Sequence, residues 1–258
     1  MSANPNLVRP DRDTMLSLSH LSDQDIARMY GCRGAAVARW RDRYGIPRSK
    51  AKSVGNVKWQ TNRDYFAQID TPAKAYVLGF IVADGHIRKE GYKVEISVKE
   101  SDAGLLDMIA AEAGCDAPLR PMINGYDGSR MARLRLCGQK LIGDLNALGL
   151  HHDKSVTATW PAVPDGLEGH LARGIWDGDG YIGKGQFELI GTSAVLDGIV
   201  AAAQRHTGCL LRRRMSGKDH SYHYAYGTRR DADVLRWMYS GATISLARKQ
   251  KAYSLYWS

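Results

Sequence analysis

The chain has 258 residues, 44% of them hydrophobic, which is enough to fill the core of one large domain or two smaller ones. Its 36 Lys and Arg residues outnumber 27 Asp and Glu residues, and the net charge of +9 favours a polyanionic partner such as nucleic acid or an acidic membrane surface. The longest apolar stretch, residues 75–83, is far shorter than the roughly 20 residues that cross a bilayer, and the N-terminus lacks the signal-peptide pattern, which excludes a membrane-spanning or secreted protein.

The N-terminal part of the chain is predicted to be a tail followed by two short helices. Residues 1–20 are rich in small polar residues without any sustained period, so we expect a flexible tail. In residues 21–50, Ser22 followed by Asp25 is typical of a helix start, and Gly31 separates the two helices. This pattern predicts a helix-turn-helix.

The second of these helices is rich in arginine on one side, as a recognition helix in the major groove of DNA would be. The alternative is a helical hairpin that packs on the main domain, since a charged outer face is often only solvated. We favour DNA contact, through Arg39, Arg41, Arg43, Arg48 and Lys50. Residues 51–70 have little apolar periodicity and are predicted to form a basic linker.

From residue 71 onward the same unit is predicted twice, in residues 71–157 and 158–258. Each copy begins with an apolar helix that ends in Asp-Gly, and a strand pair, a helix, a second strand pair and a second helix follow. These segments are residues 86–99, 102–114, 118–137 and 139–149 in the first copy, and 181–191, 193–207, 209–228 and 230–240 in the second. The pattern predicts an α+β fold of two αββαββα repeats related by a pseudo-twofold axis.

The spacing of polar residues supports this duplication. Asp84 and Asp179 are 95 positions apart, and Lys154 and Lys249, which follow the last helix of each copy, are also 95 positions apart. Alone, a DG pair usually marks a turn and a lysine after a helix is usually solvated. Two copies with equal spacing favour a shared function instead.

The apolar helices carry one internal glycine each, Gly79 and Gly174. A glycine inside a helix costs about 1 kcal/mol relative to alanine, so glycines at matching positions indicate a close approach of two backbones. We expect the two helices to pack on each other. Their C-terminal ends then bring Asp84 and Asp179 together.

Two carboxylates at helix C-termini require compensation, because the helix dipole disfavours an anion there and the two charges repel each other. Oxygen ligands without cysteine or histidine favour Mg²⁺ (or Mn²⁺) over zinc. Such a site has the parts for phosphodiester hydrolysis assisted by divalent metal ions. Lys154 and Lys249 are expected to offset charge on the scissile phosphates.

The segments VLGFIVADG and ARGIWDGDG resemble the two copies of the LAGLIDADG motif, which names a family of homing endonucleases. The resemblance covers residues 71–258 and implies a monomer in which two sheets form a saddle over a long asymmetric site in double-stranded DNA. It also implies that Asp84 and Asp179 bind the metals, with backbone carbonyls from Ala83 and Gly178. The segment RKQKA and its counterpart DKS resemble the family's basic pockets.

Polar residues on the predicted strands alternate with apolar ones, as expected when one sheet face packs on helices and the other reads DNA. We assign DNA contact to Arg88, Lys93, Arg133, Arg135, Arg212, Arg214, Tyr222 and Tyr224. Lys99 and Gln186 are candidates for the border of the active-site pocket.

Two other functions remain open for an intracellular protein of this kind. A catalytically silent DNA-binding regulator would also use the helix-turn-helix, but the paired aspartates and lysines argue against it. An RNA maturase is the other alternative, and the helix-turn-helix favours duplex DNA over RNA.

Overall fold

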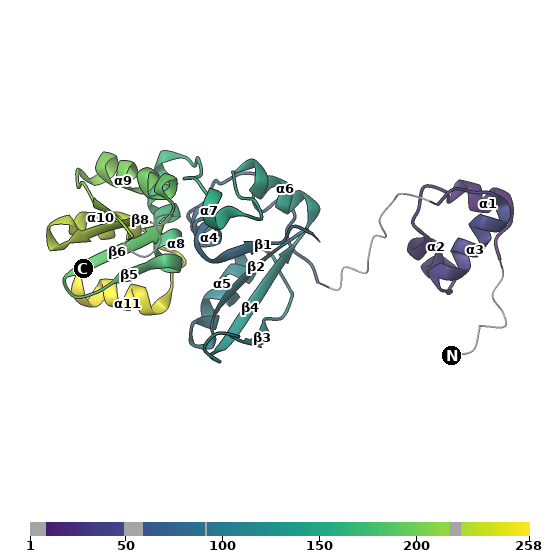
Figure 1. Cartoon of the computed structure of the whole chain (residues 1–258), viewed down its shortest axis with the longest axis horizontal. Coiled ribbons are helices and arrows are strands. Elements are labelled where there is room, and N and C mark those ends of the chain that lie inside the picture. The colour runs from purple at the N-terminus through teal and green to yellow at the C-terminus, as the bar shows by residue number, and fades with distance from the viewer. Residues whose placement is uncertain (1–8, 49–58, 91, 217–222) are drawn as a thin grey trace. The chain divides into compact units, whose positions relative to one another are not determined.

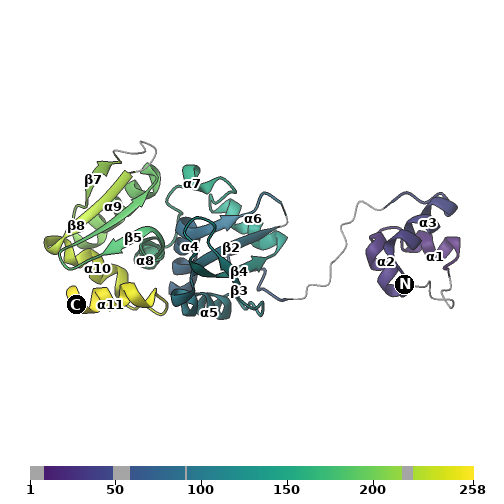
Figure 2. The same cartoon turned by 60° about the horizontal axis from the view of Figure 1, so that its bottom comes forward.

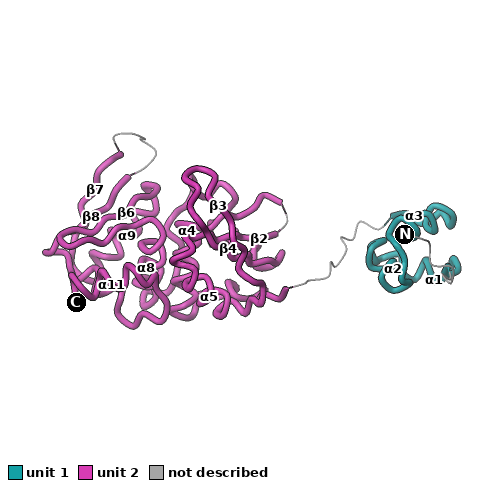
Figure 3. Tube along the Cα trace, turned by 90° about the horizontal axis from the view of Figure 1, so that it is seen from below, with its two compact units in different colours: residues 1–58 teal, residues 59–258 magenta. Residues whose placement is uncertain are grey.

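The computed structural model describes residues 9–48, 59–90, 92–216 and 223–258. The chain separates into two compact units, residues 1–58 and 59–258 (Figure 3). In the described ranges no helix is long and apolar enough to cross a membrane.

The first unit contains three short helices, α1 (Arg12–Ser17), α2 (Asp23–Met29) and α3 (Gly34–Tyr44). The expected helix start is present, because the Asp25 N–H donates to the Ser22 hydroxyl at 3.1 Å. The three helices enclose a small core of Met15, Ile26, Ala27, Val37, Trp40 and Ile46.

The prediction of a flexible tail up to residue 20 is corrected by helix α1. The Asp11 carboxylate caps this helix by accepting from the Thr14 N–H at 2.7 Å, and Met15 is fully buried in the core of the unit. A helix of six residues with one buried side chain shows no period in the sequence, so only its tertiary packing identifies it.

The predicted linker, residues 51–70, is also corrected where the structure describes it. Tyr65, Phe66 and Ile69 are buried in the core of the second unit, and the Asn62 N–H donates to the Ala113 carbonyl at 2.9 Å. Residues 59–70 therefore belong to the second unit. Residues 51–58 lie outside the described residues.

The second unit confirms the α+β fold with two αββαββα repeats (Figure 1). The first repeat consists of α4 (Pro72–Asp84), β1 (Gly85–Ile87), β2 (Lys93–Lys99), α5 (Ala103–Glu112), β3 (Arg120–Ile123), β4 (Arg130–Cys137) and α6 (Gln139–Ala147). The second consists of α8 (Glu168–Asp179), β5 (Gly180–Ile182), β6 (Gln186–Gly191), α9 (Ser193–Thr207), β7 (Arg212–Met215), β8 (His223–Thr228) and α10 (Ala232–Tyr239). Helices α7 (Lys154–Thr157) and α11 (Ala247–Tyr256) follow the first and second repeats.

The two sheets have the same antiparallel topology, with strand orders β1-β2-β4-β3 and β5-β6-β8-β7. Helices α4 and α8 pack against each other at the centre of the unit, and each sheet lies on its own side of this pair (Figure 2). In each sheet the apolar residues of alternate positions face the helices and are buried. The intervening polar residues form the opposite, open face of the sheet.

Candidate active site at the paired helix ends

The two central helices touch through their glycines, as the sequence predicts. A Cβ atom added at Gly79 would lie 2.1 Å from the Leu171 carbonyl oxygen, and one added at Gly174 would lie 2.1 Å from the Tyr76 carbonyl oxygen. The contact is reciprocal, because Leu171 is 95 positions after Tyr76, just as Gly174 is 95 positions after Gly79. Helices α4 and α8 are therefore related by a pseudo-twofold axis at this crossing.

The crossing brings the last residues of both helices, Asp84 and Asp179, to one place. A Cβ atom added at Gly178 would lie 2.3 Å from the Ala83 Cβ and 3.4 Å from an Asp84 carboxylate oxygen. Both aspartate side chains remain open to solvent. Among the described residues neither carboxylate accepts a hydrogen bond or forms an ion pair.

The protein around these acids disfavours their charged forms. For Asp179, desolvation by the surrounding protein and repulsion from Asp84 raise the pKa to about 6, although Lys154 and Lys249 lower it in part. Desolvation also raises the pKa of Asp84 above its ordinary value, and the same two lysines oppose that rise. Among the described residues, therefore, the positive charge near the paired acids is too weak to offset these effects.

Each lysine lies at the C-terminal end of one central helix. The Lys154 ammonium donates to the Val82 and Ala83 carbonyls, both at 2.8 Å, and is buried. The Lys249 ammonium is also buried and donates to two carbonyls of α8, those of Trp176 and Asp177, both at 2.7 Å. Both lysines donate to carbonyls of the last helical turn and place positive charge where the helix dipole favours it.

Burial lowers the pKa of Lys249 to about 8, while the negative charge of Asp177 opposes that change. Burial lowers the pKa of Lys154 too, and Asp179 opposes this more strongly than Asp84 does. Conversely, Lys249 lowers the pKa of Asp84 more than Lys154 does. Of the two aspartates Asp84 and Asp179, each lysine is thus coupled more strongly to the one in the other repeat.

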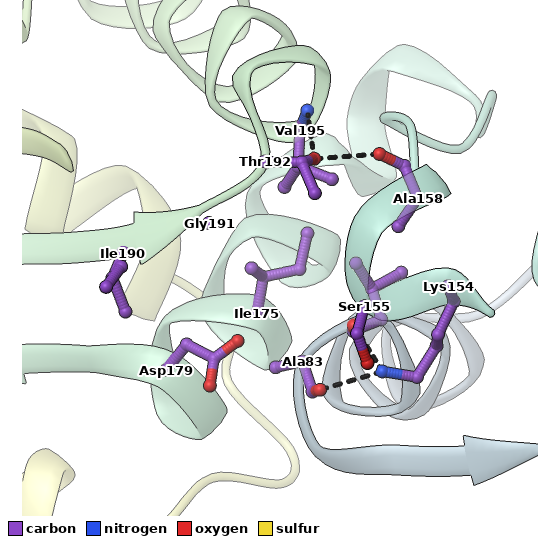
Figure 4. Close-up of a pocket in the computed structure, with 11 residues that line it drawn as sticks. Ala83, Lys154, Ser155, Ala158, Ile175, Asp179, Ile190, Gly191, Thr192 and Val195 are labelled. Carbon is purple, nitrogen blue, oxygen red and sulfur yellow. Dashed lines mark hydrogen bonds between the residues drawn. The ribbon is translucent and has the colours of Figure 1, made fainter. Parts of the chain in front are cut away.

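Two pockets flank the helix ends, and each contains one of the aspartates. The pocket of about 230 Å³ that contains Asp179 also includes Lys154 from the other repeat, and its remaining walls are largely apolar (Figure 4). Its lining residues include Ile175, Ile190, Thr192, Val195 and Ala158. The pocket of about 610 Å³ that contains Asp84 has mixed walls, whose polar residues are Ser97, Lys99, Ser101, Asp102, Asp177 and Arg248.

The two pocket-border candidates differ in position. Lys99 lines the Asp84 pocket, whereas Gln186 lies at the start of β6 opposite Thr228 and lines neither of these two pockets. Arg248, which the sequence did not single out, lies in the Asp84 pocket and forms an ion pair of 3.1 Å with Asp102. Its position directly before Lys249 in the basic segment RKQKA was the available signal.

The buried acid Asp177 connects the two repeats and the last helix. Its carboxylate accepts hydrogen bonds from the Tyr76 hydroxyl at 2.8 Å, the Tyr239 hydroxyl at 2.9 Å and the Leu246 N–H at 2.7 Å. Leu246 is the N-cap of α11, so Asp177 fixes the start of the helix that carries Lys249. At the equivalent place in the first repeat, Val82 offers no such anchor.

The residues assigned to DNA contact on the sheets lie on the open faces. Arg88, Arg133 and Arg135 surround the Glu95 carboxylate, and Lys93 lies on the same strand as Glu95, β2. On the second sheet the Arg212 and Arg214 guanidinium groups lie over the rings of Tyr226 and Tyr224, at 5.2 Å and 4.3 Å from the ring centroids. Tyr222 lies outside the described residues.

In the first unit, Arg39, Arg43 and Arg48 are exposed, and Lys50 lies outside the described residues. The expectation that Arg41 is available to DNA is wrong, because its side chain is fully buried. Its guanidinium donates to the Asp23 carboxylate and the Leu21 carbonyl, both at 2.8 Å, and to the Pro47 carbonyl at 3.1 Å. Arg41 therefore holds the three-helix unit together.

The chemistry of the Asp84 and Asp179 site fits a hard divalent cation. The described residues hold no cluster of three or more Asp, Glu, His or Cys side chains, so the only charged donors are these two carboxylates without partners. Backbone carbonyls would have to complete the ligand set. The Ala83 carbonyl already accepts from Lys154, whereas neither lysine hydrogen bond of α8 involves the Gly178 carbonyl.

The pKa of Asp179 makes stability depend on pH when no divalent cation is present. Because the folded state holds this proton more tightly than the unfolded chain, the free energy of unfolding should fall as the pH rises from about 4 to about 6. The Asp179→Asn variant should lack that fall and be more stable at pH 7 by about 1 kcal/mol, since solvent access screens part of the effect. Urea unfolding in EDTA at pH 4, 6 and 7 measures this.

The exposed residue Asp107 on α5 provides the control, because its replacement by Asn should leave the pH dependence of unfolding unchanged. Added Mg²⁺ should raise the unfolding midpoint of the unaltered chain and not that of Asp179→Asn. Equal pH profiles for the unaltered chain and Asp179→Asn would contradict the raised pKa.

Comparisons with known proteins gave matches among solved structures alone, since no family model and no curated protein matches the chain. A structure of I-DmoI in complex with DNA and Ca is 14% identical, covering 75% of this chain and 98% of that chain with a TM-score of 0.48. The homing endonuclease I-WcaI bound to its DNA recognition sequence is 9% identical, with 74% and 88% coverage and a TM-score of 0.47. Full-length DUF199/WhiA from Thermatoga maritima is also 9% identical, with 75% and 64% coverage and a TM-score of 0.47.

Proposed function

We propose that this chain is a site-specific DNA endonuclease of the LAGLIDADG homing type that hydrolyses both strands of a duplex with divalent metal ions. The observation that carries the proposal is the pair Asp84 and Asp179, whose carboxylates meet at the ends of two central helices and accept no hydrogen bond from the residues that the structure describes. Open sheet faces with basic residues lie on both sides of that pair, as a duplex substrate requires.

In this mechanism, Asp84 and Asp179 hold the cations, with the Gly178 carbonyl as a further donor. A bound Mg²⁺ or Mn²⁺ supplies Lewis acidity that lowers the pKa of water and stabilises charge on oxygen. Lys154 and Lys249 keep positive charge at the helix ends, where negative charge grows on the scissile phosphates. Arg248 and Lys99 place two further cations in the Asp84 pocket, where a phosphate can contact them.

The test uses the purified full chain and a plasmid library of genomic DNA from the organism that encodes it, with Mg²⁺ or with EDTA. We expect linear product with new ends at one sequence, and no product in EDTA. Specific binding without cleavage in Mg²⁺ or Mn²⁺ would instead support a catalytically silent regulator. Preference for a structured RNA would support the maturase alternative.

The two lysines should act on different strands. Because Lys154 is coupled more strongly to Asp179 than to Asp84, and Lys249 more strongly to Asp84 than to Asp179, each Lys→Met variant should slow cleavage of one strand by about tenfold or more. Cleavage of a duplex with a different label on each strand measures the two rates. Equal slowing of both strands by one variant would contradict this assignment, and thermal unfolding of each variant controls for loss of the carbonyl contacts.

The first unit should add affinity and no chemistry, because its exposed arginines lie on a separately folded body. Removal of residues 1–58 should weaken binding and flatten its salt dependence, since each lost phosphate contact reduces the slope of log K against log salt by about 0.9. Excess truncated enzyme should still cut the same bond. Filter binding across a salt series and mapping of the cut site measure both effects.

The double variant Arg39→Gln and Arg43→Gln in the full chain is the matched control, because both side chains are exposed and their loss leaves the core of the unit intact. It should reproduce part of the change in slope. An unchanged slope and footprint after truncation would mean that the unit is only a packing element.

A further inference from the structure

The open face of the first sheet contains an ionised cluster in which one acid holds three arginines. The Glu95 side chain is only 2% exposed, and its carboxylate accepts from Arg88 at 2.8 Å, from Arg133 at 3.5 Å and from Arg135 at 2.5 Å. Burial alone would raise the pKa of Glu95, but hydrogen bonds from Arg88 and Arg135 and the charge of Arg133 lower it below its ordinary value. Three arginines around one ionised glutamate therefore leave this face of the sheet with an excess of positive charge.

The three guanidinium groups differ in the donors that they have left. Arg88 uses Nε and Nη2 on Glu95, and Arg133 uses Nε on the Ser97 hydroxyl at 2.9 Å and Nη1 on Glu95. Arg135 uses only Nε, so its Nη1 and Nη2 groups donate to no acceptor among the described residues. Within this cluster, Arg135 is thus the arginine whose Nη1 and Nη2 groups both remain able to donate to a ligand.

The strand register explains why the Arg135 guanidinium, with its Nη1 and Nη2 donors, has a fixed orientation. Glu95 on β2 lies directly opposite Arg135 on β4, so the short cross-strand contact holds the guanidinium from one side. A guanidinium held at Nε presents two parallel N–H donors from its other side. Two such donors match the O6 and N7 acceptors that guanine shows in the major groove of DNA.

The second sheet has a glutamate at the equivalent place, but the residue opposite it is not an arginine. Gly85 lies opposite Ile96 in the first sheet, as Gly180 lies opposite Leu189 in the second, so Glu188 is the counterpart of Glu95. The residue opposite Glu188 is Tyr226, not an arginine. Among the arginines of the described ranges, Glu188 accepts only from Arg214, at 3.2 Å.

We propose that Arg135 reads one guanine in the half of the target that the first sheet covers, and that Glu95 is the positioning residue that holds its guanidinium for this contact. The inference rests on the proposed function, because it needs a duplex on the open sheet face. It goes beyond that function by naming the base, the residue that reads it and the residue that orients the reader.

Selection from a randomised duplex library tests the inference, with the full chain in EDTA so that binding alone is measured. The decisive variant is Arg135→Lys, because lysine keeps the charge for a phosphate but cannot form the paired contact with guanine. In Arg135→Lys and in Glu95→Gln, the preference for guanine at one position should fall by about tenfold, and preferences elsewhere should persist. Glu188→Gln is the matched control and should leave that guanine preference unchanged.

An unchanged profile in Arg135→Lys would overturn the inference and assign Arg135 to a phosphate. If Glu95→Gln does not fold, as thermal unfolding would show, Arg135→Lys alone decides. The proposed nuclease activity can be refuted separately from this inference. Sequence-specific binding that requires the guanine, without cleavage in Mg²⁺, would refute the nuclease activity and support the role of Arg135.

Discussion

Replacement of either Asp84 or Asp179 with Asn should abolish double-strand cleavage and leave DNA affinity within about tenfold. The two carboxylates meet at the helix ends, accept no hydrogen bond from the described residues and repel each other, so they have no evident structural role. Asn keeps the size of the side chain but removes the charge that a divalent cation needs. Linear product from a plasmid target and gel-shift affinity, both measured for each purified variant, separate the chemistry from binding.

This comparison requires that the variants fold. Because the pKa of Asp179 is raised, the Asp179→Asn variant should be at least as stable as the unaltered chain at neutral pH. Asp107→Asn, on an exposed face of α5, is the matched control and should cut normally. Undiminished linear product from Asp84→Asn or Asp179→Asn would refute the paired-aspartate mechanism.

Substitution of Gly174 with Ala should destabilise the second unit by about 3 kcal/mol or more. The added Cβ atom would lie 2.1 Å from the Tyr76 carbonyl oxygen and 2.8 Å from the Phe80 nitrogen, and both are backbone atoms that cannot rotate away. Helices α4 and α8 would have to separate, which opens the core and moves both aspartates. Urea unfolding followed by tryptophan fluorescence measures the loss, and cleavage should fall with it.

The matched control is Gly143→Ala, because Gly143 also lies inside a helix but has open space where its Cβ would be. That variant should gain up to about 1 kcal/mol from the higher helix propensity of alanine. A Gly174→Ala variant as stable as the unaltered chain would show that the two helices do not approach each other as closely as described.

The repeats could be predicted from the sequence because their signals are local and occur twice. Helix α9 spans residues 193–207 as expected, and the strand pairs match their predicted segments except that β1 and β5 begin one residue earlier. Short elements could not be predicted, since Met15 in α1 or Phe66 before α4 is buried through tertiary contacts that leave no period in the sequence. Arg41 is different: it follows the buried Val37 by four positions on the same face of α3, so its burial could have been expected.

The candidate site was partly predictable for the same reason. Equal spacing identified both aspartates and both lysines, but the coupling of each lysine to the aspartate of the other repeat follows from how the helices cross. The Glu95 cluster depends on the register between β2 and β4, which alternation of polar and apolar residues does not specify. Distances along the chain thus indicated the members of the site, and packing determined their partners.

The hydrogen bond between Tyr76 and Asp177 has a consequence for how the two halves arose and stayed together. A duplicated gene first encodes identical halves, which can associate as homodimers, whereas this contact joins unlike positions: Leu171 is the counterpart of Tyr76, and Val82 is the counterpart of Asp177. Two copies of the first half would leave the Tyr76 hydroxyl facing a valine, and two copies of the second would leave Asp177 facing a leucine. Self-association of the first half would bury the Tyr76 hydroxyl without its partner, at a cost of about 1 to 3 kcal/mol per site. Self-association of the second half would remove one of the three hydrogen bonds that Asp177 accepts and leave those from Tyr239 and Leu246. The divergence of these two positions therefore makes each half selective for the other and disfavours a return to the symmetric ancestor.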